Sequence, residues 1–340
     1  MDDTSVKRII ASLMSGHLTL DKVKARIIDM VPSSWFRETE GSSIWVTGYR
    51  VLRVPQESFA RGPRVIDLGE VRAVILFGTI TCLDSREAKI EIITENQWRL
   101  DASAIHGHET PEGAYLLLLA PFDVDGTSGN EAITRQKIGV AAGLFAAFNG
   151  RNMVYERLID NVLSMTGDEA TVMTPVWENP FSFVAPDVSD TRLDVISSAY
   201  RIIASLPQSD QNRVFLSLRW FESALYERGV DSCLKYWIAL ETLGMLDTTN
   251  VHPLNEILSH AYNLSCKEAR DRFKLGRLHG LRSRIVHGGQ IIPIHAQLLE
   301  YIEALYVDIL FEHLGLSCER RAEEAMNKPG FALDAYLHER

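Results

Sequence analysis

Hydrophobic positions in the second half of the chain repeat with the period of an α-helix. Val214, Leu218, Phe221 and Leu225 are spaced as one helix face, and comparable stripes recur from residue 191 to about 328. The pattern predicts helices over 191–205, 210–228, 231–246, 253–263, 266–286 and 295–315, with a short one near 319–328. We therefore expect this half of the chain to be entirely helical.

The first half shows a different pattern, in which β-branched and aromatic residues gather in short runs bounded by turn residues. Strands are predicted within 44–51, 71–81, 88–94 and 113–119. Together they predict three to five strands in a mostly antiparallel sheet. Helical spacing over 4–31, 131–148 and 152–165 predicts further helices around this sheet.

A proline-containing stretch separates the two halves. Residues 173–190 hold Pro175, Pro180 and Pro186 and lack helical periodicity, which is typical of a linker. We predict an N-terminal α+β domain over 1–172, a linker over 173–190, a helical domain over 191–328 and a C-terminal tail over 329–340. A length of 340 residues is compatible with two domains. The predicted fold class is α+β.

The amino-acid composition excludes several classes of protein but does not change the predicted fold. With 46% hydrophobic and 24% charged residues, the chain resembles an ordinary globular protein rather than a collagen-like or disordered one. Its net charge of −10 excludes a protein that coats nucleic acid non-specifically, because such proteins are basic overall. Any nucleic-acid role must therefore depend on a local basic patch.

The lack of a recognisable signal segment and the spacing of the cysteines favour a cytoplasmic protein. Met1-Asp2-Asp3-Thr4 is not followed by a basic and then apolar signal segment, and the apolar runs fall short of the roughly 18 residues that span a bilayer. The four cysteines are far apart and form no C-x-x-C pair. We expect reduced thiols and no interaction with a membrane.

The positive charge of the chain is concentrated between Lys267 and His287. Seven of these residues are Lys or Arg and two are acidic. Such a strip on an acidic protein can focus a local anion site. The alternative is a solvated helix face that pairs with acidic helices.

Arg282 and His287 are the candidate reactive pair within this strip. On a continuous helix their side chains would point about 140° apart, so they converge only if the helix ends near His287. Gly288-Gly289 is a plausible stop, because glycine tolerates the left-handed conformation at a helix end. Histidine exchanges protons near neutral pH, and arginine binds phosphate through two donors. Together the two residues suit transfer chemistry on a phosphodiester.

The segment Arg282-Ser283-Arg284-Ile285-Val286-His287 resembles the R-x4-H signature of HEPN domains, the higher eukaryotes and prokaryotes nucleotide-binding family. Its surroundings, from Leu281 to Gly289, look like the ApeA-like branch. A second block, Tyr236-Trp237-Ile238-Ala239-Leu240-Glu241-Thr242-Leu243, resembles the helix that precedes the signature helix in that branch. The resemblance covers about residues 190–328 and none of the N-terminal half.

This resemblance implies a helical bundle that forms a homodimer across the signature helices. The implied activity is RNA cleavage without a metal or other cofactor, in which a 2′-hydroxyl attacks the adjacent phosphate and leaves a 2′,3′-cyclic phosphate. His287 would be the general base or acid, Arg282 would bind the phosphate, and Glu241 would orient one of them. Arg284, Arg277, Lys274 and Ser283 would contact the RNA. Ser283 departs from many active members, which have Asn, Asp or His after the arginine.

The resemblance also implies a biological role. The protein would be a toxin or abortive-infection effector in anti-phage defence that cleaves RNA, with tRNA as a candidate substrate. The N-terminal domain would be a sensor that binds an unknown trigger or regulator. The alternative hypothesis is a non-catalytic HEPN module for dimerisation or ligand binding in a defence or regulatory protein.

Two other groups of residues carry weaker signals. His106 and His108 would share a face on a strand and suggest a metal hydrolase, but they precede a turn and no third ligand is evident, which favours a solvated loop. Trp45, Tyr49 and Trp98 suit either a stacking platform for bases or the packing of the sheet.

Overall fold

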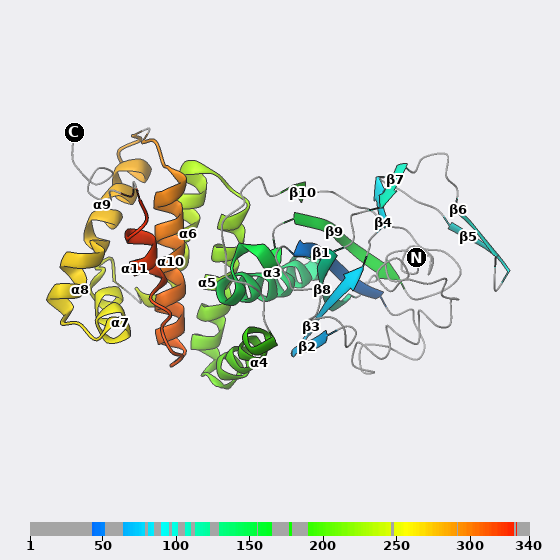
Figure 1. The fold of residues 1–340 in the computed structure, drawn as a ribbon, viewed down its shortest axis with the longest axis horizontal. Helices are drawn as coiled ribbons and strands as arrows, with labels where there is room; N and C mark the ends of the chain where they lie inside the picture. The colour runs from blue at the N-terminus through cyan, green and yellow to red at the C-terminus, as the bar shows by residue number, and fades with distance from the viewer. Residues whose placement is uncertain are drawn as a thin grey trace. The chain divides into compact units, whose positions relative to one another are not determined.

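The computed structural model assigns the chain to two compact units, residues 1–198 and 199–340. It describes residues 43–51, 64–78, 81–84, 90–94, 97–100, 106–109, 113–122, 129–154, 156–164, 177–178, 190–245, 248–290, 292–329 and 331 (Figure 1). The helical segment predicted over 4–31 lies outside these residues, as do most of the predicted linker over 173–190 and most of the tail over 329–340.

The first unit contains an antiparallel sheet in which six described strands follow the order β10-β9-β1-β8-β3-β2. Its strands are β1 (Ser43–Val51), β2 (Arg64–Leu68), β3 (Val71–Gly78), β8 (Gly113–Phe122), β9 (Glu156–Ser164) and β10 (Trp177–Glu178). Two smaller antiparallel pairs join β4 (Thr81–Asp84) to β7 (His106–Glu109) and β5 (Ile90–Thr94) to β6 (Gln97–Leu100). The predicted mostly antiparallel arrangement is confirmed, but the described strands outnumber the three to five that were expected.

Strand β8 lies in the middle of the sheet, and its sequence explains why. Residues 114–120 are all buried. Because successive strand residues point to opposite faces, an uninterrupted apolar run suits a strand that is covered on both sides. Helix α3 (Gly129–Asn149) packs on β8 and β3, and its residues 138–149 are buried too.

Two predictions in the first unit are wrong. Residues 152–165 were expected to be helical, but a short 3₁₀ turn, η4 (Arg151–Val154), is followed by strand β9, which pairs with β1. Residues 106–109 were expected in a loop, but they form β7, in which His106 pairs with Asp84 and His108 with Cys82. Both segments are strands because a distant partner strand supplies their hydrogen bonds.

The second unit is helical in its described residues. Its elements are the end of α4 (Asp190–Ser205), then α5 (Gln208–Leu225), α6 (Gly229–Gly244), α7 (His252–Tyr262), α8 (Cys266–Phe273), α9 (Leu275–Val286), α10 (Ala296–His313) and α11 (Arg321–Met326). Helix α10 packs against α6, α7 and α11, and α5 packs along α6. The core contains Phe221, whose ring stacks on Tyr306 with centroids 4.4 Å apart.

One predicted helix is two helices. The apolar pattern predicted a continuous helix over 266–286, but the chain breaks at Lys274, which has a left-handed backbone (φ 52°) and ends α8 while it begins α9. The break frees the carbonyl oxygen of Phe273, which accepts a hydrogen bond from the buried Tyr301 hydroxyl at 2.9 Å. Phe273 and Leu275 on either side are fully buried, and the Phe273 ring packs on Tyr262 of α7, so this burial outweighs the unfavourable conformation of Lys274.

The sheet and the helices together establish an α+β chain. Among the helices in the described ranges, none is both long and apolar enough to cross a membrane.

Candidate functional site

The end of α9 brings Arg282 and His287 together. The last helical residue is Val286, and His287 follows it as the C-cap. His287 keeps αR backbone angles (φ −98°, ψ −32°), and its N–H still bonds to the carbonyl oxygen of Ser283 at 2.9 Å. Arg282 Nη1 lies 3.3 Å from His287 Nε2. The two residues that the sequence identified as a reactive pair are therefore in contact.

Two glycines shape this helix end. The backbone N–H of Gln290 reaches back to the carbonyl oxygen of Arg284 at 3.2 Å, across Gly289, which has a φ of +60°. A Cβ atom at Gly288 would lie 2.6 Å from the same carbonyl oxygen. Gly288 is thus required by a close approach and Gly289 by its conformation.

Glu241 on α6 lies on the other side of the Arg282 guanidinium. Its Oε2 is 3.7 Å from Arg282 Nη2, and its Oε1 accepts a 2.7 Å hydrogen bond from the indole N–H of Trp237, one turn earlier on the same helix. Trp237 is only 1% exposed, whereas the side chains of Arg282 and Glu241 are about one-quarter exposed. A chain of polar contacts therefore runs from a buried indole through Glu241 and Arg282 to His287 at the surface.

The contact between Arg282 and His287 restricts which imidazole nitrogen can accept. A guanidinium has only donors, so a hydrogen bond across this contact needs Nε2 as the acceptor, with a ring proton on Nδ1. His287 is exposed, as is the neighbouring Val286. The site is thus an open surface arrangement of a proton acceptor, a guanidinium and a carboxylate.

Sequence reasoning gave no role to Trp237 or His279, although both belong to this site. The rings of His279 and Trp237 stack with centroids 5.8 Å apart, and His279 precedes Arg282 by one turn of α9. The spacing of Trp237 and Glu241, four residues apart on a helix, was the available signal, because side chains at this spacing are neighbours.

The four residues predicted to contact RNA do not share one face with Arg282. Arg277 and Arg284 are about 20° apart around α9, but Arg284 is about 160° from Arg282. Lys274 lies at the break between α8 and α9, and Ser283 accepts the backbone N–H of His287 through its carbonyl oxygen. The buried Leu278 and Leu281 lie between the two flanks.

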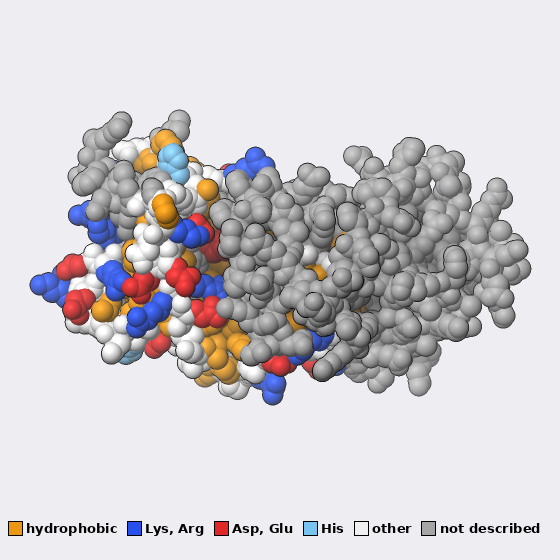
Figure 2. All heavy atoms as spheres, viewed as in Figure 1, with side chains coloured by type: hydrophobic (Ala, Val, Ile, Leu, Met, Phe, Trp, Pro, Cys, Tyr) orange, Lys and Arg blue, Asp and Glu red, His pale blue; other side chains and the backbone are white. Residues whose placement is uncertain are grey.

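The part of the basic strip that belongs to α8 is largely matched by acidic groups. Arg272 pairs with Glu323 on α11, and Arg270 lies 3.6 Å from Asp271. On the face drawn in Figure 2, positive and negative side chains are interspersed over the α7–α8 end of this unit.

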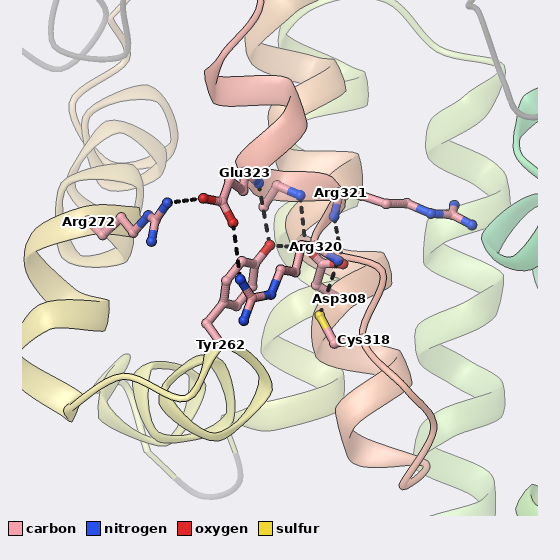
Figure 3. Close-up of polar contacts among 8 residues, drawn as sticks. Tyr262, Arg272, Asp308, Cys318, Arg320, Arg321 and Glu323 are labelled. Carbon is pink, nitrogen blue, oxygen red and sulfur yellow. Dashed lines mark hydrogen bonds and ion pairs between the residues drawn. The ribbon is translucent and has the colours of Figure 1, made fainter.

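A second polar cluster in this unit is centred on Asp308 of α10, which is fully buried (Figure 3). Its carboxylate accepts backbone N–H groups of Arg321 at 3.0 Å and Ala322 at 2.8 Å, and also the hydroxyl of Tyr262. Burial raises its pKa above the usual value, although these hydrogen bonds partly oppose the shift. Burial and the Asp308 carboxylate also raise the pKa of the Cys318 thiol to about 12.

This Asp308 cluster joins three helices rather than forming a reactive site. Tyr262 belongs to α7, Asp308 to α10 and the two N–H donors to the start of α11. Arg272 and Arg320 both pair with Glu323 at its outer side (Figure 3). A carboxylate whose oxygens are filled by backbone donors has a structural role.

The remaining candidates lie in the first unit. Trp45 and Tyr49 are 3% and 1% exposed, and the Trp45 ring packs against Phe122, so these two aromatic residues pack the sheet rather than offer a surface for bases. The side chains of Trp98, His106 and His108 lie outside the described part of the structure. Among the side chains that are described, no group of three or more His, Cys, Asp or Glu residues could hold a metal ion.

No family model, curated protein or solved structure matches this chain.

Proposed function

We propose that the protein is a metal-independent endoribonuclease of the HEPN type, with Arg282, His287 and Glu241 as its reactive group. The observation that supports this most is the 3.3 Å contact between Arg282 Nη1 and His287 Nε2, with the Glu241 carboxylate on the other side of the guanidinium. This arrangement places a proton acceptor and a fixed positive charge close enough together to contact the same phosphate group. Both are needed to cleave an RNA phosphodiester.

The reaction begins when an RNA phosphate draws the guanidinium of Arg282 away from His287. A phosphate accepts two hydrogen bonds from the guanidinium and binds it more strongly than a neutral imidazole does. The lone pair on Nε2 is then free to accept the proton of the 2′-hydroxyl. Arg282 therefore covers the base in the resting protein and exposes it when the substrate is bound.

In the chemical step, the 2′-oxygen forms a bond to phosphorus while the bond from phosphorus to the 5′-oxygen breaks. Arg282 stabilises the charge that builds on the non-bridging oxygens. The leaving 5′-oxygen takes a proton, which in a homodimer would come from the second copy of His287. The products are a 2′,3′-cyclic phosphate and a 5′-hydroxyl.

Glu241 keeps the guanidinium in place before the substrate arrives. Its Oε1 is held by the indole N–H of Trp237, which leaves Oε2 directed at Arg282. Arg277 and Arg284, on the other flank of α9, would bind more distant phosphates of the same strand. The biological role that we attach to this activity is that of a toxin or abortive-infection effector, controlled by the N-terminal region.

The alternative function is a non-catalytic module for dimerisation or ligand binding. It is favoured by the partners that Arg282 already has, because Glu241 and His287 both contact the guanidinium without any ligand. The two functions differ in what RNA does in the presence of the protein. Only the nuclease produces new RNA ends.

The test incubates the purified full chain with total RNA and with tRNA in EDTA, beside the variants His287→Ala and His260→Ala. His260 is an exposed histidine on α7 outside the site, so its replacement controls for loss of an imidazole. We expect cleavage with cyclic phosphate ends by the wild type and by His260→Ala, and a loss of at least about a hundredfold in His287→Ala. Equal cleavage by His287→Ala would refute the proposed site, and RNA binding without cleavage by any of the three would favour the alternative.

A further inference from the structure

Cys233, Cys266 and Cys318, whose side chains the structure describes, lie in three different surroundings and are not in disulfides. Cys233 is buried in α6, and burial raises its pKa to about 12. Cys318 is partly exposed, but it lies beside the Asp308 carboxylate. Cys266 is also partly exposed, and it lies beside a histidine instead of a carboxylate. This difference makes Cys266 chemically distinct.

Cys266 belongs to a row of three side chains that reaches across α7 and α8. Its Sγ lies 3.7 Å from Nδ1 of His252, and Nε2 of the same ring lies 3.3 Å from Oε1 of Glu256. A carboxylate can only accept, so Nε2 carries the proton that faces Glu256. Nδ1 is then left with a lone pair directed toward the thiol. The order carboxylate, imidazole, thiol is that of an activated nucleophile.

The position of Cys266 in α8 adds to this effect. It is the first residue of an eight-residue helix, directly after Ser265, whose side chain caps the helix by accepting the backbone N–H of Glu268. The positive end of a helix dipole stabilises a thiolate in its first turn. The imidazole is therefore placed to accept the proton of a thiol at the start of a helix.

We propose that Cys266 is a site of reversible modification, at which the thiol exchanges with a low-molecular-weight disulfide such as oxidised glutathione. His252 takes the thiol proton, and the Cys266 sulfur attacks one sulfur of the disulfide. A new disulfide forms between the protein and one half of the reagent, and the other half leaves as a thiolate that is then protonated. The reagent supplies the oxidising equivalent, so electrons balance without a further oxidant. This site is independent of Arg282 and His287 and does not rest on the nuclease proposal.

Cys318 is the internal control for this site. It is exposed to a similar degree, but its neighbour Asp308 is a negative group that opposes formation of a second negative charge. In an unmodified protein the two thiols compete for the same reagent under the same conditions. A difference between them therefore reports their surroundings rather than the reagent or the buffer.

The test treats the folded full chain with oxidised glutathione near pH 7 and measures the mass of each cysteine-containing peptide over time. We expect Cys266 to gain glutathione at least about tenfold faster than Cys318, because exchange follows the fraction of thiolate. His252→Ala should slow the reaction at Cys266 by about tenfold, and Glu256→Gln by a smaller factor. Both replaced side chains are more than half exposed, so both variants should fold. Equal rates at Cys266 and Cys318, or an unchanged rate at Cys266 in His252→Ala, would overturn the proposal.

Discussion

Arg282 and His287 are five positions apart on the chain, and their side chains meet at 3.3 Å at the end of α9. The N–H of His287 still bonds to the carbonyl oxygen of Ser283, so the contact is made across the last turn of the helix. The glycine pair directly behind His287 ends this turn and is therefore a target for experiment.

Replacing Gly288 by alanine should disrupt the site without removing any reactive group. The new Cβ would lie 2.6 Å from the carbonyl oxygen of Arg284, so the helix end must shift and the contact between Arg282 and His287 is lost. The expected result is a fall in RNA cleavage of about tenfold or more. Gly280→Ala is the matched control, because it lies in the same helix with no atom within 4 Å of the added carbon, and it should retain activity. Equal activity of the two variants would argue against this role of the helix end.

Replacing Trp237 by phenylalanine should release Glu241 while keeping most of the buried ring. Loss of the 2.7 Å hydrogen bond should lower the stability by about 1 kcal/mol. Because Oε2 is then no longer held toward Arg282, kcat for RNA cleavage should fall several-fold with little change in KM. Steady-state kinetics with a short RNA measures both constants. As a control, Trp220→Phe on α5 should leave the ratio of kcat to KM unaltered. A change in KM with no change in kcat in the Trp237→Phe protein would contradict a positioning role.

Replacing Arg277 and Arg284 together by alanine tests the second flank of α9. If these side chains bind phosphates, the affinity for single-stranded RNA should fall for every sequence. The slope of the logarithm of the binding constant against the logarithm of the salt concentration should become less steep by about 0.7 for each lost phosphate contact. Fluorescence anisotropy of a labelled RNA at several salt concentrations gives this slope. Cleavage at saturating RNA should change little, since neither residue contacts Arg282 or His287. An unaltered slope would show that RNA does not reach this flank.

Replacing Asp308 by asparagine tests the buried carboxylate that joins α7, α10 and α11. The amide nitrogen would face backbone N–H donors, and the resulting loss of stability should be about 2 kcal/mol. Burial raises the pKa of Asp308 above 3.8, so the folded state holds its proton more tightly than the unfolded state does. Its contribution to stability is therefore complete below that value and is lost as the pH rises through the folded pKa. Urea unfolding of both proteins should show their difference in stability shrinking as the pH rises from 3.8, and a growing difference would contradict this assignment.

The helices of the second unit were largely predictable, and the sheet of the first only in part. Stripes such as Val214, Leu218 and Phe221 define a helix by themselves, because their period needs no partner. The break at Lys274 could not be read in this way, since lysine has no preference for a left-handed backbone and the apolar pattern continues across it. Strand β9 was interpreted as a helix because Leu158, Ile159, Val162 and Leu163 also fit a helical spacing. Its identity depends on pairing with β1, more than a hundred residues earlier.

The candidate site was also predictable only in part. The resemblance brought Arg282, His287 and Glu241 into one hypothesis, and in the structure Arg282 contacts each of the other two. The grouping of Arg277 and Arg284 with Arg282 treated the positive charge as one surface, whereas their positions around α9 place them on opposite flanks of its buried face. Trp237 was quoted within a motif but had no role, because a tryptophan in an apolar helix suggests packing first.

The position of Glu241 between a buried indole and a surface guanidinium has a practical consequence. Any anion that draws Arg282 away changes the net charge near Oε2, and the indole of Trp237 is bound to the same carboxylate. The emission of an indole depends on the electric field across its ring. The fluorescence of Trp237 should therefore follow binding at the site, and the Trp237→Phe protein supplies the background signal of the other tryptophans. The protein contains its own optical reporter, which needs neither a label nor turnover.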